Sequence, residues 1–410
     1  HITITISIKK AIHLRGNGDP DETIIDAGGV TPCLELMHSN AAVSAVTLQN
    51  GYGRYYGGLW LHDYSEARDC IIQDCVGDLW AGGVFARPGS HIERCVVRRN
   101  EAVVGYPADH SAGGLFLHGR ALNCLIYGNT AELMQMTDDQ GASGCLVSGG
   151  ELLNSTVSVN GSPEMRLYPG LCIIDEGVAI NCIAFFNANA GGEKNWQTVD
   201  GGRIDYSCTR PMPPDPVGDG NITDNPMFAD VFEENYRLLP ASPCIDAGTN
   251  SVVAWPTDLD GIDRVVDGNF DGTNRVDMGA YENNPTTYDS DGDGLTDGAE
   301  VLTYGTSPTN GNTDGDQQSD YEEMVADTDG ANSNDYFCIT AISNISPVSV
   351  HFESSSGRQY RMASCSNLVH GTWTNVPGAG PRMGVGGPDQ LLDTNEPPRG
   401  LFYRVDVALP

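Results

Sequence analysis

Residues 82–100 read GGVFARPGSHIERCVVRRN, and residues 113–129 read GGLFLHGRALNCLIYGN. Both begin with Gly-Gly, continue through two short apolar strands and end at Asn. Further copies occupy residues 57–75, 143–160 and 169–187, and a weaker copy precedes them. Internal repeats of about 20–50 residues are the signature of stacked repeat architectures. The sequence therefore predicts a solenoid.

Two positions stay in register through these copies. The first is mostly Cys or another small residue: Ala45, Cys70, Cys95, Cys124, Ser155 and Cys182. Two residues later, an apolar or small position continues the same strand face: Thr47, Ile72, Val97, Ile126, Val157 and Ala184. The second recurring position, five residues after the first, is mostly Asn: Asn50, Cys75, Asn100, Asn129, Asn160 and Asn187. We expect the Cys position and the apolar position two residues after it to face inward. Asn tolerates a left-handed turn, and stacked Asn side chains can form a ladder.

Repeats of 25–31 residues predict a right-handed parallel β-helix of roughly nine or ten coils, stacked about 4.8 Å apart. They are too long for a left-handed hexapeptide helix and too rich in strands for a helical solenoid. Insertions follow the Asn position at residues 101–112, 130–142, 161–168 and 188–203. Because they leave the same corner of each coil, we expect one wall of loops.

Composition divides the chain into four predicted domains. Residues 1–248 carry the coils, and residues 249–285 are rich in Asp and Gly, which predicts a cap over the last coil. Residues 286–335 form an acidic linker. Residues 336–410 contain short alternating strands and turns, which predict a small β-sandwich. Because the first residues already alternate like a strand inside a sheet, we expect a segment to precede residue 1.

Twelve cysteines allow two interpretations. In a secreted protein they could form six disulfides. We favour reduced thiols, because four of them recur at one stacked inward position. Cys338 and Cys365 fall in two strands of the last domain and are candidates for a pair.

The formal net charge is −33, and residues 249–335 hold 20 Asp and Glu against two Arg, which accounts for −18 of it. Such a chain is repelled by nucleic acid and anionic membranes. The sequence contains no run of about 18 apolar residues, so it predicts no membrane span. Bound divalent cations are the obvious means of relieving the repulsion in the acidic segment.

The strongest chemical motif lies in that segment. Residues 289–300 and 312–323 place oxygen donors at loop positions 1, 3, 5, 7, 9 and 12, the spacing of an EF-hand calcium loop. The predicted Ca²⁺ ligands are Asp289, Asp291, Asp293, Leu295, Asp297 and Glu300 in the first loop, and Asn312, Asp314, Asp316, Gln318, Asp320 and Glu323 in the second. Position 6 is Gly294 in the first loop but Gln317 in the second, so the second turn must strain or change shape. The alternative is a solvated acidic linker.

A third run, residues 267–272, begins like a calcium loop but has Met278 at position 12. A structural turn is the better interpretation there.

Two groups of side chains could bind an acidic glycan. The outward rows on the first strand of each coil are Trp60, Phe85, Phe116, Leu146 and Cys172, and beside them His62, Arg87, His118, Ser148 and Ile174. The loop wall carries His110, Asp138, Asp139, Arg166, Tyr168, Lys194 and Trp196. Paired acids and basic groups could serve a lyase or hydrolase, but the Asn-Thr-Asp and Arg-x-Lys motifs of polygalacturonase-like enzymes are absent. We favour packing for the rows and solvated loop residues for the wall.

A resemblance to a known protein family lies in the coils and in four segments: PASPCIDAG (240–248), TDLDG (257–261), DMGAYE (277–282) and the ending LFYRVDV (401–407). In these parts, the chain resembles secreted bacterial right-handed β-helix surface proteins with a choice-of-anchor-type cap. Residues 289–323 resemble thrombospondin type 3 or dockerin-like calcium repeats. The resemblance implies export and surface display, but no single activity.

We therefore expect a secreted or cell-surface structural, adhesive or assembly protein stabilised by calcium. Its partner would be a second copy of itself, as a homo-oligomer or filament, or a cell-surface glycan. The alternative is a polysaccharide lyase or glycoside hydrolase acting on an acidic polysaccharide.

Overall fold

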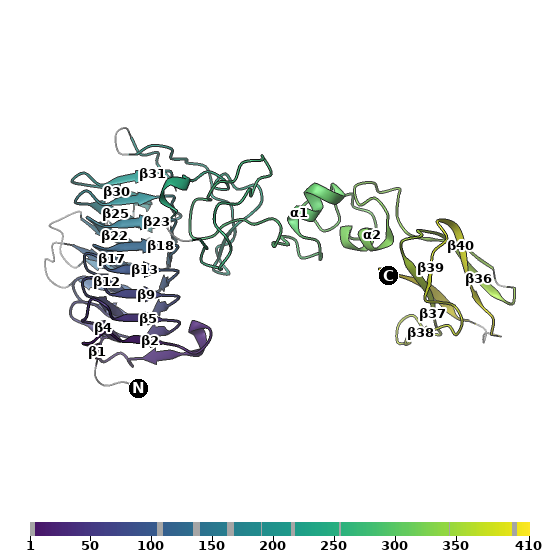
Figure 1. Cartoon of the computed structure of the whole chain (residues 1–410), viewed down its shortest axis with the longest axis horizontal. Coiled ribbons are helices and arrows are strands. Elements are labelled where there is room, and N and C mark those ends of the chain that lie inside the picture. The colour runs from purple at the N-terminus through teal and green to yellow at the C-terminus, as the bar shows by residue number, and fades with distance from the viewer. Residues whose placement is uncertain are drawn as a thin grey trace. The chain divides into compact units, whose positions relative to one another are not determined.

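The computed structural model describes residues 5–104, 110–133, 140–161, 168–189, 191–214, 218–253, 256–343, 345–395 and 400–410. The chain forms two compact units, His1–Asn284 and Pro285–Pro410. In the first unit, short parallel strands stack into one column (Figure 1). No helix within the described stretches is long and apolar enough to cross a membrane.

Each rung of the column gives one strand to each of three parallel sheets. Sheet A contains β1 (Ile6–Ile8), β4 (Leu34–Leu36), β8 (Leu59–Leu61), β12 (Val84–Ala86), β17 (Leu115–Leu117), β22 (Cys145–Ser148), β25 (Leu171–Ile174) and β30 (Trp196–Thr198). Sheet B contains β2 (His13–Arg15), β5 (Ala42–Ser44), β9 (Glu66–Arg68), β13 (His91–Glu93), β18 (Arg120–Leu122), β23 (Glu151–Leu153), β26 (Val178–Ile180) and β31 (Arg203–Asp205). Sheet C contains β3 (Ile24–Asp26), β6 (Thr47–Gln49), β10 (Ile71–Gln73), β14 (Val96–Arg98), β19 (Leu125–Tyr127), β24 (Thr156–Ser158), β27 (Ile183–Phe185) and β32 (Cys208–Thr209).

This arrangement confirms the parallel β-solenoid. Eight strands per sheet make about seven full turns, so the expectation of nine or ten coils is too high. The weakest copy is also aligned one residue off, because Ile71 pairs with Thr47, and Ile72 pairs with Leu48. That coil is one residue shorter than the next, so Val46, Leu48 and Gly51 occupy the positions assigned to Ala45, Thr47 and Asn50.

The inward face of each rung forms one continuous apolar core. Leu59, Ile72 and Val97 belong to it and are fully buried, as are Cys95 and Cys124. All twelve cysteines lie in described stretches and are free thiols, Cys338 being exposed and Cys365 buried. Burial raises the pKa of the Cys124 thiol to about 12. Thiols of this kind are packing groups, because the reactive form is the thiolate.

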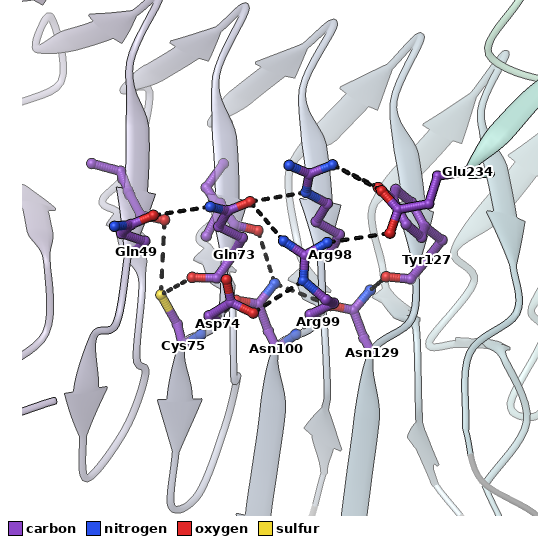
Figure 2. Close-up of polar contacts among 12 residues, drawn as sticks. Gln49, Gln73, Asp74, Cys75, Arg98, Arg99, Asn100, Tyr127, Asn129 and Glu234 are labelled. Carbon is purple, nitrogen blue, oxygen red and sulfur yellow. Dashed lines mark hydrogen bonds and ion pairs between the residues drawn. The ribbon is translucent and has the colours of Figure 1, made fainter. Parts of the chain in front are cut away.

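A ladder of asparagines runs along one corner, as predicted (Figure 2). Oδ1 of Asn129 accepts the backbone N–H and the Nδ2–H of Asn100, each at 3.0 Å. Oδ1 of Asn160 accepts the same two groups of Asn129. Asn187 and Asn195 continue the ladder. None of these residues adopts a left-handed backbone. The left-handed residue is the preceding one, such as Arg99 with φ +52°. These positions therefore use the side-chain amide of asparagine and not its tolerance of a left-handed backbone.

Segments that follow the ladder corner form further strand pairs, and some of their neighbours cover sheet A. They include sheet D, formed by β7 (Tyr52–Gly53), β11 (Val76–Gly77), β15 (Glu101–Val104) and β20 (Thr130–Leu133), and the pairs β16 (Ser111–Ala112) with β21 (Gly141–Ala142) and β28 (Ala188–Asn189) with β29 (Gly192–Glu193). Tyr56, Ala81 and Ala112 from this side pack on the outward side chains of sheet A. The described parts of the insertions therefore begin as paired strands at one corner.

The outer face of sheet C is covered by the segment from residue 218 to residue 284, which includes β33 (Phe228–Asp230), β34 (Asn235–Leu238) and the short 3₁₀ turn η2 (Asn250–Val252). Glu234 binds Arg98, Arg99 and Tyr127 (Figure 2). The guanidinium of Arg264 is buried against Glu282 and donates to Asn123.

This flanking segment runs along the side of the column. The described residues between 249 and 284 contact the sides of several rungs, in part through Asn123 and Asn181, which each precede a Cys position. The N–H of Gly279 donates to the carbonyl of Asn181, and that of Ala280 donates to Oγ1 of Thr156. The last rung is covered by residues 218–222, where Asn221 accepts the N–H of Ser207 and donates to the carbonyl of Ile204.

The second unit combines two loop–helix repeats with antiparallel sheets. Its helices are α1 (Asp297–Ala299), which continues as a π-helical turn over Glu300–Tyr304, and α2 (Asp320–Ala326). One sheet contains β35 (Ile339–Ser343), β36 (Val348–Ser354) and β40 (Gly387–Asp393), and the other contains β37 (Gln359–Cys365), β38 (Thr374–Asn375), β39 (Arg382–Met383) and β41 (Phe402–Ala408). Phe352, Tyr360 and Met362 from both sheets share one core.

In the first unit, a 3₁₀ turn spans Pro20–Glu22.

Candidate cation-binding loops

The predicted aromatic row exists, but it is covered. Trp60, Phe85 and Phe116 lie in register on adjacent strands of sheet A. Phe85 is 8% exposed and Phe116 4%, while Leu146 and Cys172 are fully buried. Only Trp60 keeps partial exposure, so this row offers no continuous stacking platform for a sugar. Its side chains form a second apolar core outside the solenoid.

The polar groups beside this row have partners within the chain. Nε2 of His62 lies 3.2 Å from Oε1 of Glu35, and Arg87 pairs with Asp63 at 3.1 Å. Nδ1 of His118 lies 3.0 Å from the Ser148 carbonyl. Burial, more than its neighbours, lowers the pKa of His118.

The residues predicted for the loop wall fall into three groups. Asp138, Asp139 and Arg166 lie outside the described residues. His110 and Lys194 are half-buried, and Tyr168 is buried. Trp196 is not on the wall, because it begins β30, pairs with Leu171 and packs against the main core. The insertion that carries Trp196 had been expected to loop out, but it provides the last strand of sheet A.

The two acidic loops share one internal scaffold. In the first loop, the carboxylate of Asp289 accepts the N–H of Gly292 and that of Gly294. Oδ1 of Asp293 accepts the N–H of Leu295 at 2.8 Å. In the second loop, Asn312 accepts the N–H of Gly315, and Asp316 accepts that of Gln318 at 2.6 Å. Side chains at positions 1 and 5 thereby hold each turn.

Each scaffold leaves carboxylate oxygens buried without a donor. Within the described structure, no hydrogen bond reaches Oδ2 of Asp291 or Oε2 of Glu300. In the second loop, Oδ2 of Asp314, Oδ2 of Asp316 and both oxygens of Glu323 are unpaired as well. The side chains of Glu300 and Glu323 are fully buried. An unpaired buried carboxylate oxygen is costly, and either a proton or a bound cation lowers that cost.

The oxygens also converge. Asp289, Asp291 and Asp293 each provide one oxygen within 4.8 Å of the others, and Asp314, Asp316 and Glu323 do the same in the second loop. Burial, reinforced by the surrounding carboxylates, raises the pKa of Glu300 and that of Glu323 to about 7. These donor sets fit a divalent metal ion.

No family model, curated protein or solved structure matches this chain. The arguments for its function therefore depend on the geometry of its own residues. Oxygen-only donors, most of them carboxylates, are the set that hard cations prefer.

Position 9 of each loop accepts hydrogen bonds from position 2 of the same loop. Asp297 accepts the N–H of Ser290 at 2.9 Å and its hydroxyl at 2.8 Å. Asp320 accepts the same two donors from Thr313, both at 2.8 Å. Both carboxylates are buried. They brace position 2 of their own loop, and their oxygens are already paired.

The two loops differ in backbone conformation at position 6, where the second loop has no glycine. Gly294 has φ +109°, whereas Gln317 is not left-handed, so the turn changes shape there. The bond from the N–H of Gln318 to Asp316 survives this change. The side chain of Gln318 accepts the N–H of Phe337 at 2.7 Å, which connects the second loop to the following strand segment.

Two residues beside the loops were missed from the sequence. Thr306 donates its hydroxyl to Oε1 of Glu300 at 3.4 Å. Asn312 follows Asp289 by 23 residues, and the same spacing relates Thr306 to Asp329. Asp329 contributes to the raised pKa of Glu323 after burial and the nearer acids. The 23-residue period was the signal that could have found both.

Proposed function

We propose that this protein is a calcium-stabilised, secreted or cell-surface structural protein, in which a right-handed solenoid serves adhesion or assembly. The observation that carries the proposal is Glu323. Its side chain is fully buried beside Asp314 and Asp316, and neither of its oxygens has a partner among the described residues. A bound cation would offset the cost of burying these groups together in their ionised form.

Calcium suits these loops better than magnesium. Ca²⁺ takes six to eight oxygens in flexible geometry, while Mg²⁺ demands a near-ideal octahedron. The loop carboxylates would supply part of the shell, with backbone carbonyls and water completing it. Calcium would thereby neutralise part of the acidic segment. Extracellular modules commonly bind Ca²⁺ with dissociation constants of about 10⁻⁴–10⁻³ M, and we propose an affinity in that range.

The second loop is also joined to the C-terminal sheets, which we propose form a sandwich. Arg358, on the approach to β37, donates to the carbonyls of Met324 and Val325 at 2.8 and 2.7 Å. These carbonyls belong to α2, which follows the loop. Because cation binding would fix the start of α2, it would also order the sheets that contact α2.

A structural role accounts for the solenoid better than a catalytic one. Sheets A and C are covered by the chain itself. The outer face of sheet B carries ion pairs between neighbouring rungs, such as Arg120 with Glu151. We propose that its partner is a second copy of this chain or a cell-surface glycan.

Calorimetry of the full chain, with calcium and with a chelator, tests the proposal. We expect chelation to lower the melting temperature of the Pro285–Pro410 unit and to leave the solenoid transition unchanged. Glu323→Gln should reproduce the effect of chelation, whereas Glu353→Gln, an exposed acid on β36, should not. Equal melting of the second unit with and without chelator would refute a stabilising cation.

A second assay separates structure from catalysis. The calcium-loaded protein should release neither unsaturated nor reducing ends from acidic polysaccharides. Turnover of such a substrate would replace the structural role with that of a lyase or hydrolase.

A further inference from the structure

The two loops differ in how their position-12 glutamates are placed. Glu323 has an oxygen within 4.8 Å of those of Asp314 and Asp316, so it already belongs to its cluster. In the first loop the cluster is Asp289, Asp291 and Asp293, and Glu300 is not part of it. In the second loop the position-12 acid is thus grouped with the acids at positions 3 and 5, whereas in the first loop the acids at positions 1, 3 and 5 form a group of their own and Glu300 is not within 4.8 Å of all three.

The residues after each helix strengthen this difference. Thr306 donates its hydroxyl to Oε1 of Glu300, which holds that carboxylate with a neutral partner. The residue 23 positions later is Asp329, an acid. Next to it, a side chain at Gly330 would lie 3.4 Å from Oε2 of Glu323. Asp329 thus adds a negative charge beside the second loop, which compensates for the neutral Asn312 at position 1, where the first loop has Asp289.

The helices that carry the two glutamates differ as well. Glu323 lies inside α2, whose N-terminus has a capping box between Ser319 and Glu322. Glu300 begins a π-helical turn, after an α-helix of only three residues. A π-helical turn is an irregular, uncommon conformation. Glu300 therefore begins an irregular turn, whereas Glu323 lies inside a capped helix.

We propose that the second loop binds its cation first, and that the first loop closes afterwards, when Glu300 leaves Thr306 and joins Asp289, Asp291 and Asp293. This inference rests on the proposed calcium function. It reverses the order suggested by position 6, where Gln317 would make the second loop the poorer site.

One contact transmits the first binding event to the other loop. The N–H of Tyr321, in the first turn of α2, donates to Oδ2 of Asp293 at 3.0 Å. The Tyr321 ring also lies against Gly294, where an added side chain would meet it at 3.2 Å. Because a cation in the second loop fixes Glu323 and hence α2, it holds Tyr321 and Asp293 in position. Loading the second loop thus prepares the first.

Calorimetric titration of the chelated full chain with Ca²⁺ tests the order. Wild type should show two events whose affinities differ about tenfold or more, the scale on which ligand-shell changes act. Glu300→Gln should remove the weaker event and change the tighter one less than about twofold. Glu323→Gln should remove the tighter event and weaken the other. Thr306→Val should tighten the weaker event, since it frees Glu300, and Glu353→Gln should change neither.

The outcomes separate the two ideas. No calcium binding by wild type would refute the proposed function. Two events of equal affinity, or loss of the tighter event in Glu300→Gln, would refute the order while leaving the calcium function intact. If Glu323→Gln does not fold, Asp329→Asn decides in its place, because it should weaken only the tighter event, and an unchanged titration would count against the proposal.

Discussion

The backbone N–H of Cys75 donates to Oδ1 of Asn100 at 3.0 Å, and Cys75 stands where the ladder would require another asparagine. Its Sγ accepts the N–H of Gly51 at 3.4 Å and lies 3.1 Å from the carbonyl of Gln73. The thiol therefore performs both tasks of an amide, with a weaker acceptor and a weaker donor. The ladder continues through sulfur for one more rung.

Interrupting the ladder should destabilise the solenoid. Asn129→Ala removes the acceptor of the buried Asn100 N–H, which costs about 1–3 kcal/mol for that orphaned group alone. The free energy of unfolding of the solenoid should fall accordingly in denaturant titrations. Asn40→Ala, in an exposed turn, should change it by less than about 0.5 kcal/mol. Equal stability of the two variants would contradict a stabilising ladder.

The sulfur rung predicts a difference between two buried cysteines. Cys75→Ala leaves the N–H of Gly51 without its acceptor, whereas Cys145→Ala removes a fully buried thiol of the same core for which no such bond is present in the described structure. Both leave similar cavities. Cys75→Ala should therefore lower the free energy of unfolding by about 1 kcal/mol more than Cys145→Ala does. Indistinguishable values would show that Sγ of Cys75 contributes only packing.

The flanking segment should depend on one buried ion pair. Arg264 and Glu282 are fully buried at both side chains and 3.0 Å apart. Arg264→Met leaves Glu282 charged and buried, which should cost about 3–5 kcal/mol. Residues 249–284 should then become sensitive to limited proteolysis. Arg120→Met breaks an exposed pair and should cost less than about 1 kcal/mol. Protection of the segment in Arg264→Met would contradict this role.

The acidic loops predict opposite pH dependence with and without cation. Without cation, the pKa of Glu300 and that of Glu323 are raised to about 7 from 4.5, so the folded state favours the protonated forms. Stability of the chelated second unit should therefore fall as pH rises from about 4.5 through about 7. With saturating calcium it should rise over the same range, because the ligands must be ionised. Melting temperatures measured from pH 4.5 to 8 test both signs, and the double variant Glu300→Gln, Glu323→Gln should flatten both.

The sequence predicted most of what depends on period. The inward cysteine position, the Asn ladder and the register of Trp60, Phe85 and Phe116 follow from a repeat whose side chains align rung over rung. The shift of the weakest copy was missed because no ladder asparagine marks Gly51. The burial of Phe85 could not be predicted either, since it depends on where separate segments such as Ala81 and Ala112 fold back.

Local spacing predicts which acids of the cation loops can converge, but not which hydrogen bonds they accept. The convergence of Asp314, Asp316 and Glu323 follows from the loop pattern. The engagement of Asp297 with Ser290 does not, because a motif gives the position of an oxygen but not its hydrogen-bond partner. The contact between Asp293 and Tyr321 joins two loops and has no signal in either one alone.

The attachment of the flanking segment along several rungs has a mechanical consequence. Tension on the chain at Asn284 would reach the column through Asn123, Asn181 and Arg98, which belong to different rungs. The load is then shared among contacts to several rungs. A tether leaving from the last rung would instead peel the strands away one by one.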